Sequence, residues 1–129
     1  MFDDEIPFSE KSAANLMRKI LRGLAYIHTS GYMHRDIKLE NIMVTMQVEN
    51  GKLISLEPSL TDFGMAKQFK EGERETQCLG TPLYMAPELL QTKSYDKKVD
   101  IWAIGILTYI LLTGNPPYES NSLSGLLRQ

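Results

Sequence analysis

The strongest pattern of hydrophobic positions lies between Ser9 and Thr29, where apolar side chains recur at helical spacing. The positions on this stripe are Ala13, Leu16, Met17, Ile20, Leu21, Leu24, Ile27 and His28. Ser9 is a suitable N-cap, Glu10 places a negative charge in the first turn, and Gly31 favours a stop. The pattern therefore predicts an amphipathic helix from Ser9 to Thr29.

An alternating pattern follows on both sides of Asn50-Gly51, a dipeptide that favours a two-residue hairpin turn. The alternating apolar residues are Val44, Met46 and Val48 before the turn and Leu53 and Leu56 after it. This spacing predicts two paired strands, the first of which begins within Ile42–Val44. We expect Leu60-Thr61 to form another short strand, and residues 32–41 to form a polar loop.

The segment from Asp100 to Leu112 has no polar face, because nearly every position in it is apolar. Such a segment predicts a central helix that is buried on all sides. Gly114 ends this helix, and the two prolines that follow prevent its continuation. The apolar run is too short to span a bilayer, so we expect no membrane partner.

Between the hairpin and this helix, residues 62–88 are irregular and rich in glycine and proline. A loop of that length inside a compact domain is usually functional. Pro87 suits the first turn of a short helix over Glu88–Gln91, and Ser120 or Asn121 could cap one more helix. The predicted fold class is mainly α with a small β-hairpin, in one domain that spans residues 1–129.

Composition and charge restrict the partners and the compartment. The 129 residues carry a formal net charge of -2 and include one cysteine, Cys78. Nucleic-acid binding usually requires a basic excess, and one cysteine cannot form an internal disulfide. Met1–Pro7 is acidic and lacks the features of a signal peptide. We therefore expect a cytoplasmic protein with no nucleic-acid partner.

The candidate chemistry is concentrated in the polar loop, which holds Asp36, Lys38 and Asn41. Asp62 follows the hairpin, and because a hairpin brings its two ends together, Asn41 and Asp62 should lie side by side. An amide oxygen beside a carboxylate suits Mg²⁺, which binds one or two carboxylates together with substrate phosphates. Asp36 could accept a proton from a hydroxyl, and Lys38 could offset charge on a phosphoryl group. Together these residues predict a phosphoryl-transfer site.

Several motifs occur in an order and at a spacing that resemble the protein kinase family. In chain order they are His34-Arg35-Asp36-Ile37-Lys38-Leu39-Glu40-Asn41, Asp62-Phe63-Gly64, Gly80-Thr81-Pro82, Ala86-Pro87-Glu88 and Asp100-Ile101-Trp102-Ala103-Ile104-Gly105. Because they cover nearly the whole chain, they are far more specific than one motif alone. The resemblance implies part of the C-terminal lobe of a serine/threonine protein kinase, with ATP and Mg²⁺ as cofactors and a protein as substrate.

The resemblance also implies a role for each residue of the polar loop. Asp36 would be the catalytic base, and Lys38 would contact the transferred phosphate, a lysine typical of serine/threonine kinases. Asn41 and Asp62 would hold Mg²⁺. Thr81 would form hydrogen bonds near Asp36 and Lys38 and so tie the substrate platform to the catalytic loop.

Other motif residues would have structural roles by the same resemblance. His34 would stack on Phe63, which is followed by Gly64, and would not act as a base. Asp100 would anchor the backbone of the catalytic loop at its start. Trp102 belongs to the motif that begins the buried central helix of the family.

Arg35 and Thr76 form a candidate switch. Arg35 precedes the proposed base and would face the activation segment, which comprises residues 62–88. A phosphate placed on Thr76 by an upstream activating kinase could pair with Arg35 and order this segment. The alternative is that Thr76 is a solvated loop residue. The lysines that we expect to be surface charges are Lys67, Lys70, Lys93, Lys97 and Lys98.

A finer resemblance connects residues 109–118 with the calcium/calmodulin-dependent kinase group. Ile110 stands where many kinases with a preference for basic substrates have an acid, which leaves Glu40 as a contributor to such a preference. The hairpin is longer than is usual in the family, with Gln47–Glu57 as an apparent insertion. Glu88 would pair with an arginine that lies beyond Gln129.

The chain contains no Gly-x-Gly-x-x-Gly loop and no strand with the lysine that holds the ATP phosphates. We therefore expect residues 1–129 to lack the ATP-clamping N-terminal lobe and the last helices of the C-terminal lobe. We expect this chain alone to be marginally stable and inactive, and the full-length form to transfer phosphate. The alternatives are a non-catalytic kinase-like binding module and an unrelated α+β domain. An active kinase is favoured because the four polar residues that the chemistry needs are all present: Asp36, Lys38, Asn41 and Asp62.

Overall fold

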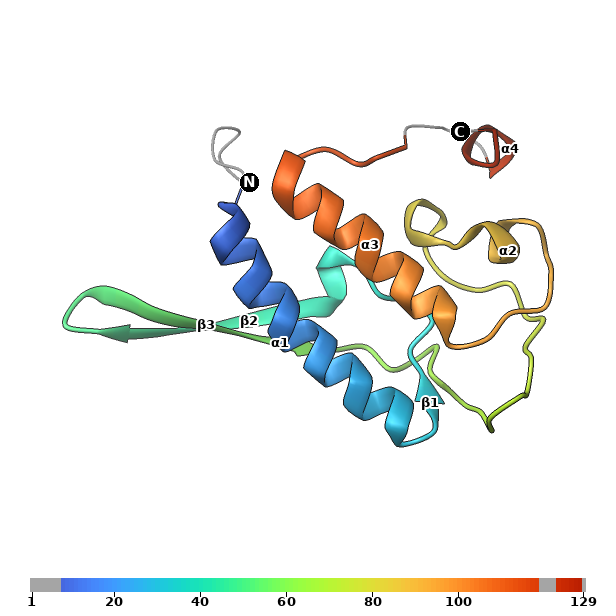
Figure 1. Cartoon of the computed structure of the whole chain (residues 1–129), viewed down its shortest axis with the longest axis horizontal. Coiled ribbons are helices and arrows are strands. Elements are labelled where there is room, and N and C mark those ends of the chain that lie inside the picture. Colours follow the sequence, from blue (N-terminus) through green and yellow to red (C-terminus); the bar gives the residue numbers. More distant parts are fainter. Residues whose placement is uncertain (1–7, 119–122, 129) are drawn as a thin grey trace.

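The computed structural model describes residues 8–118 and 123–128. Figure 1 shows two long helices lying side by side, with a two-stranded ribbon projecting from one side of them. The helices are α1 (Glu10–Thr29), α2 (Pro87–Leu90), α3 (Lys98–Thr113) and α4 (Leu123–Leu126), with 3-10 turns at Leu39–Asn41 and Pro82–Tyr84. The strands are β1 (Tyr32–Met33), β2 (Ile42–Glu49), β3 (Lys52–Leu60) and β4 (Lys67–Gln68). The predicted features at Met1–Pro7 and at the cap Ser120 or Asn121 lie outside the described residues.

Helix α1 confirms the predicted helix, although Leu21, one of the positions on the predicted stripe, is 42% exposed. The Ser9 hydroxyl accepts a hydrogen bond from the Ser12 backbone N–H at 3.2 Å, a cap worth about 1 kcal/mol. Gly31 ends the helical region with φ +81°, a conformation that glycine adopts without steric cost. The buried side chains on its inner face are Ala13, Leu16, Met17, Ile20 and Leu24.

The hydrophobic core lies between α1 and one face of α3. On α3, Ala103, Ile104 and Leu107 are buried in it, and the side chain of Leu107 is fully inaccessible. The prediction that α3 is buried on all sides is wrong, because Ile101 is 45% exposed and Tyr109 46% exposed. α1 and the 3-10 turn at Pro82–Tyr84 pack against only part of its circumference, so its uniformly apolar sequence overstated the burial.

The hairpin turn has the predicted geometry. Asn50 and Gly51 both have positive φ, +52° and +74°, as a type I′ turn requires. Strands β2 and β3 pair antiparallel from Ile42 opposite Leu60 at the base to the tip, with an irregularity between Gln47 and Val48. The separate strand predicted at Leu60-Thr61 is wrong, since Leu60 ends β3.

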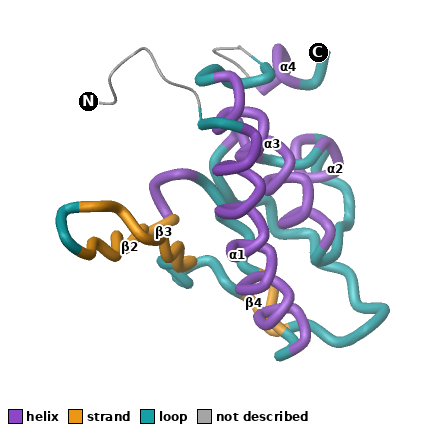
Figure 2. The backbone as a smooth tube through the Cα atoms, turned by 60° about the vertical axis from the view of Figure 1, so that its left-hand side comes forward, coloured by secondary structure: helices purple, strands orange, loops and turns teal. Residues whose placement is uncertain are grey.

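The ribbon has one apolar face, and only its base is covered. Ile42, Leu56 and Leu60 pack against the main core. Farther out, Met46 is 67% exposed and Val48 60% exposed. Figure 2 shows the same ribbon standing away from the helices in a second view. In the described residues, no helix is long and apolar enough to cross a membrane.

Candidate active site

The polar loop between β1 and the 3-10 turn at Leu39–Asn41 is anchored by one buried carboxylate. Asp100, 1% exposed near the start of α3, accepts hydrogen bonds from the backbone N–H of His34 at 2.9 Å and of Arg35 at 2.8 Å. Its Oδ2 also lies 2.8 Å from Nε2 of His28, a residue of α1. The predicted backbone anchor is therefore present, and it joins the loop to both long helices.

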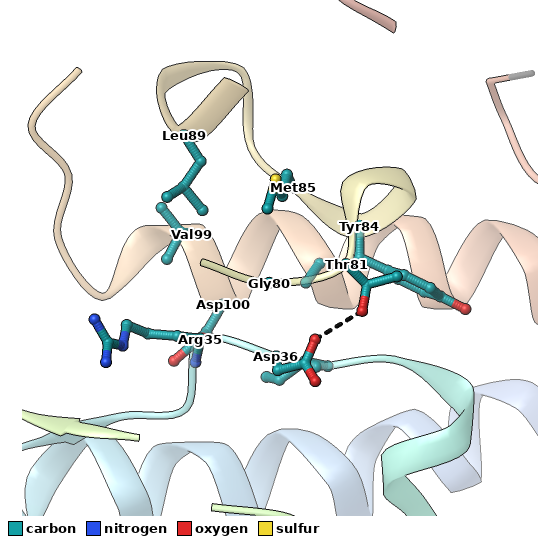
Figure 3. Close-up of a pocket in the computed structure, with 11 residues that line it drawn as sticks. Arg35, Asp36, Gly80, Thr81, Tyr84, Met85, Leu89, Val99 and Asp100 are labelled. Carbon is teal, nitrogen blue, oxygen red and sulfur yellow. Dashed lines mark hydrogen bonds between the residues drawn. The ribbon is translucent and has the colours of Figure 1, made fainter. Parts of the chain in front are cut away.

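The carboxylate of Asp36 lies at the centre of a hydrogen-bonded cluster. Lys38 Nζ is 2.9 Å from Asp36 Oδ2. Thr81 Oγ1 donates to Asp36 Oδ1 at 2.9 Å and accepts a bond from Lys38 Nζ at 3.0 Å. Figure 3 shows Thr81 directed at Asp36, while the side chain of Arg35 is directed away from it. The contacts expected of Thr81 are all formed, so both carboxylate oxygens have fixed orientations.

The same cluster sets the protonation of its members. Burial opposes ionisation of Asp36, but the hydrogen bonds from Lys38, Thr81 and Asn41 outweigh it and lower the pKa of this carboxyl. The hydrogen bond to Asp36 raises the pKa of Lys38, to which the charge of Asp62 also contributes. At neutral pH Asp36 is an anion and Lys38 a cation. Asp36 is thus ready to accept a hydrogen bond from a hydroxyl group.

Close backbone packing holds Thr81 in place. Gly80 has φ +124°, and a Cβ at this position would lie 3.0 Å from the carbonyl oxygen of Arg35. A larger residue would therefore push the segment away from the polar loop. The cavity between the two segments encloses only about 10 Å³, which leaves no room for a substrate group beneath the cluster. Asp36 is itself only 5% exposed, so a substrate would have to reach the small part of the residue that meets solvent.

Asn41 and Asp62 are brought together by the base of the hairpin. The backbone N–H of Thr61 donates to the carbonyl oxygen of Asn41 at 2.9 Å, and Asp62 is the next residue. The Asn41 amide nitrogen donates to Asp36, which leaves the amide oxygen on the other side of the group. One oxygen of the exposed Asp62 carboxylate accepts from the Gly64 N–H at 3.2 Å, and no hydrogen bond to the other is found among residues 8–118 and 123–128. An amide oxygen and a carboxylate oxygen are the hard ligands that suit Mg²⁺.

The backbone of Asp62 supports this interpretation. Its φ of +57° is unusual for a residue other than glycine, and such conformations cluster at functional sites. Within the described ranges, no group of three or more histidine, cysteine or acidic side chains could hold a metal by itself. Mg²⁺ does not need such a group, because substrate phosphates and water supply its remaining ligands.

His34 is a structural residue in this geometry. Its ring is fully buried, with Nε2 3.0 Å from the carbonyl oxygen of Thr61 and Nδ1 accepting from the Asp36 N–H at 3.3 Å. These partners fit a neutral ring with the proton on Nε2. The ring also contacts Phe63 with a centroid distance of 5.0 Å, but the two rings are tilted by 55° and do not form the stack that the sequence resemblance implied. With both nitrogens engaged, His34 is not placed to act as a base.

Comparison with known proteins agrees with this arrangement. The family model for the protein kinase domain matches residues 1–129. The chain belongs to the protein kinase family. It is 42% identical over 122 residues to calcium/calmodulin-dependent protein kinase type 1 of Caenorhabditis elegans. The aligned region makes up 95% of this chain and 33% of that protein.

Two further kinases show the same relationship. A probable myosin light chain kinase of Dictyostelium discoideum is 46% identical over 116 residues, covering 89% of this chain and 32% of its own length. Serine/threonine-protein kinase 33 of Mus musculus is 39% identical over 127 residues, which make up 95% of this chain and 26% of that protein. The kinase chain described here thus spans about a third or less of the length of these relatives.

Arg35 faces the activation segment, as predicted, and is largely buried there. Its Nε donates to the carbonyl oxygen of Met65 at 2.6 Å. Its Nη1 lies 3.3 Å from the Tyr95 hydroxyl and 3.7 Å from a carboxylate oxygen of Glu75. Thr76, the predicted switch residue, is exposed. Its role as a switch stays a prediction.

Three residues of this region form contacts that the sequence did not predict. Lys67 is exposed, as expected of a surface charge, but it also forms a close ion pair with Glu75. Neither Glu75 nor Tyr95 belongs to a sequence motif, and Tyr95 is only 1% exposed. The one available signal was the run of charged residues in 70–75, and it does not distinguish a buried acid from its exposed neighbours.

Two motif residues have surroundings that differ from expectation or remain open. Trp102 is 37% exposed, so it is not part of a helix buried on every side. Glu88 is half-buried, and within the described ranges no cation lies in ion-pair distance of its carboxylate. Its pairing with a distant arginine stays a prediction.

Proposed function

We propose that this kinase chain is part of the C-terminal lobe of a serine/threonine protein kinase. In the full-length form it would transfer the γ-phosphate of ATP to a serine or threonine hydroxyl of a protein. The ATP-clamping lobe would come from outside residues 1–129, and the chain alone would be inactive. The compartment we propose is the cytoplasm. The short span of the chain against its relatives supports the view that catalysis needs more than these residues.

The observation that carries this proposal is the Asp36–Lys38–Thr81 cluster. In it an ionised carboxylate, 5% exposed, is held by side-chain donors from Lys38, Thr81 and Asn41. A substrate hydroxyl placed there would donate to Asp36, which would orient its oxygen for attack and take its proton as the new bond to phosphorus forms. The lowered pKa makes Asp36 a weak base, which suits a loose transition state in which the proton moves late.

Lys38 would contribute by offsetting negative charge on the transferred group. Its ammonium already lies between Asp36 and the Thr81 hydroxyl, and its pKa is raised, so it stays charged. Asn41 and Asp62 would hold Mg²⁺, which when bound with ATP supplies charge neutralisation on the phosphates. Thr81 fixes both Asp36 and Lys38 and would place the substrate platform beside them.

The proposal is tested by phosphate transfer from radiolabelled Mg-ATP to a serine or threonine peptide library, using protein made from the full reading frame. We expect Asp36→Asn to lower kcat by about a hundredfold or more, because the base is lost while the shape is kept. The matched control is Asp96→Asn, since Asp96 is a surface residue paired with Arg74 at 3.5 Å.

The outcomes separate the candidate functions. Full activity in Asp36→Asn would remove Asp36 from the role of base. Absence of transfer by the unaltered protein, with peptide binding retained, would instead favour the non-catalytic binding module.

A further inference from the structure

Glu75 lies in the middle of the activation segment, and its carboxylate is nearly enclosed by donors. Lys67 Nζ forms a close ion pair with Oε2, and Arg35 Nη1 lies 3.7 Å from the same oxygen. The other oxygen, Oε1, accepts the backbone N–H groups of Thr76 at 2.7 Å and of Gln77 at 3.0 Å. The residue is only 9% exposed. Its charge is therefore matched by two cations and two backbone donors.

The backbone of Glu75 is fixed as firmly as its side chain. Its N–H and C=O form both hydrogen bonds of a bridge with Tyr95, each 2.8 Å long. The hydroxyl of Tyr95 donates to the carbonyl oxygen of Gln77 at 2.7 Å and lies 3.3 Å from Arg35 Nη1. Arg35, Glu75 and Tyr95 thus form one buried network, and the segment that continues to Thr81 starts from it.

This network also decides the charge of Glu75. The hydrogen bond from Lys67, and then those from the backbone of Gln77 and Thr76, lower the pKa of this carboxyl to about 2. The group is fully ionised at any pH at which the protein would work. Arg35 and Lys67 consequently have an anionic partner without any covalent modification.

We propose that Glu75 is a positioning residue that orders the activation segment in place of a phosphate on Thr76. The link to the reaction is short, because Arg35 directly precedes Asp36 and the segment held by Glu75 delivers Thr81 to the same carboxylate. The proposal rests on the proposed function, since it concerns the regulation of that site. It implies a kinase whose activation segment is in place without an upstream kinase.

Charge balance argues against a phosphate beside this carboxylate. A phosphothreonine at position 76 would bring up to two further negative charges next to an anion whose two cations are already engaged. The Thr76 side chain is exposed, while the backbone N–H of the same residue is what Glu75 binds. Phosphorylation at this position would compete with Glu75 for Arg35 and Lys67.

The test compares variants of the full-reading-frame protein by kcat/KM for peptide phosphorylation and by hydrogen exchange of residues 75–81. We expect Glu75→Gln to lower kcat/KM about tenfold or more and to speed exchange in these residues, because Arg35 and Lys67 lose their anion. The matched control is Glu71→Gln. The Glu71 side chain is 91% exposed, and its ion pair with Lys97, at 3.5 Å, is a surface pair that should contribute little to stability. It should leave both measurements unchanged.

A second variant moves the carboxylate by two positions without changing the net charge. Gln77 Oε1 lies 3.5 Å from Arg35 Nη1, so Gln77→Glu combined with Glu75→Gln returns an anion to Arg35. We expect this double variant to recover most of the lost kcat/KM. Thr76→Ala and treatment with a phosphatase should leave the unaltered protein as active as before.

The results that would overturn the proposal are specific. One is normal exchange and normal kcat/KM in Glu75→Gln. Another is a loss of activity in Thr76→Ala or after phosphatase treatment, which would make phosphate the required anion. Failure of the double variant to recover activity would show that Glu75 acts by packing and not by charge. If the unaltered protein transfers no phosphate, the proposed function fails, and the exchange measurement still decides whether Glu75 orders the segment.

Discussion

The polar loop 34–41 and the β2–β3 ribbon are consecutive in sequence, but they are stabilised in opposite ways. In the loop, the side chains of His34 and Asp36 are buried, and each has a hydrogen-bond partner in a distant segment, Thr61 for His34 and Thr81 for Asp36. In the ribbon, the ladder between the two strands supplies most of the order, and Met46 and Val48 project into solvent. Order in the loop depends on the rest of the fold, whereas order in the ribbon is local.

This difference explains where the chemistry lies. A reacting carboxylate must be held in one orientation, and fixed donors such as those around Asp36 achieve this without reorganisation during the reaction. A projecting ribbon can bend about its base without moving Asn41, because Ile42 and Leu60 are packed into the core there. Extra length in the ribbon is therefore compatible with an undisturbed Asn41 and Asp62, the proposed Mg²⁺ ligands, at its base.

The largest loss of stability is expected from Asp100→Ala, which removes the long-range anchor of the polar loop. The change leaves the backbone N–H groups of His34 and Arg35 unpaired in a buried place and removes the partner of His28. We expect the free energy of unfolding to fall by about 3 to 5 kcal/mol. Urea denaturation measures this directly.

Two controls accompany Asp100→Ala. Asp100→Asn should be intermediate, because an amide offers only one acceptor oxygen to the two N–H groups. Glu49→Ala, on the exposed ribbon, should change stability by less than about 0.5 kcal/mol. Equal losses in Asp100→Ala and Glu49→Ala would show that the loop is held locally, like the ribbon.

The parts of the molecule that follow from local rules could be predicted from the sequence. The Ser9 cap, the stop at Gly31 and the Asn50-Gly51 turn each depend on residues within a few positions of one another. The contacts of Thr81 with Asp36 and Lys38 were expected only because the chain resembles a known family. Nothing in periodicity or composition joins positions 36 and 81.

The errors arise where a residue's surroundings are set by distant parts of the chain. The ion pair of Lys67 was missed because its partner, Glu75, is fixed by a bridge to Tyr95 that no sequence pattern reveals. Trp102 was assigned to a fully buried helix because an apolar sequence cannot indicate how many neighbours surround it. Both errors concern tertiary context, which overrides local propensity.

A smaller effect on the same loop is expected from Thr81→Val. Valine has the shape of threonine but cannot donate to Asp36 or accept from Lys38. We expect a loss of about 1 to 2 kcal/mol in unfolding free energy and a lower kcat in the peptide assay. Thr45→Val, at an exposed ribbon position, is the matched control and should leave kcat unchanged. A normal kcat in Thr81→Val would mean that Lys38 and Asn41 are enough to orient Asp36.

The smallest effect tests the ribbon itself, through Gly51→Ala. Gly51 has φ +74°, and a methyl group added to its Cα would meet nothing within 4 Å, so the cost is conformational and not steric. We expect a loss of about 1 kcal/mol in unfolding free energy, with kcat unchanged because the base of the ribbon is held by the core. Gly105→Ala is the matched control, since it also meets open space but lies inside α3, where alanine should stabilise by a similar amount. A drop in kcat for Gly51→Ala would show that the tip communicates with the site, and the separation between local and long-range order would then fail.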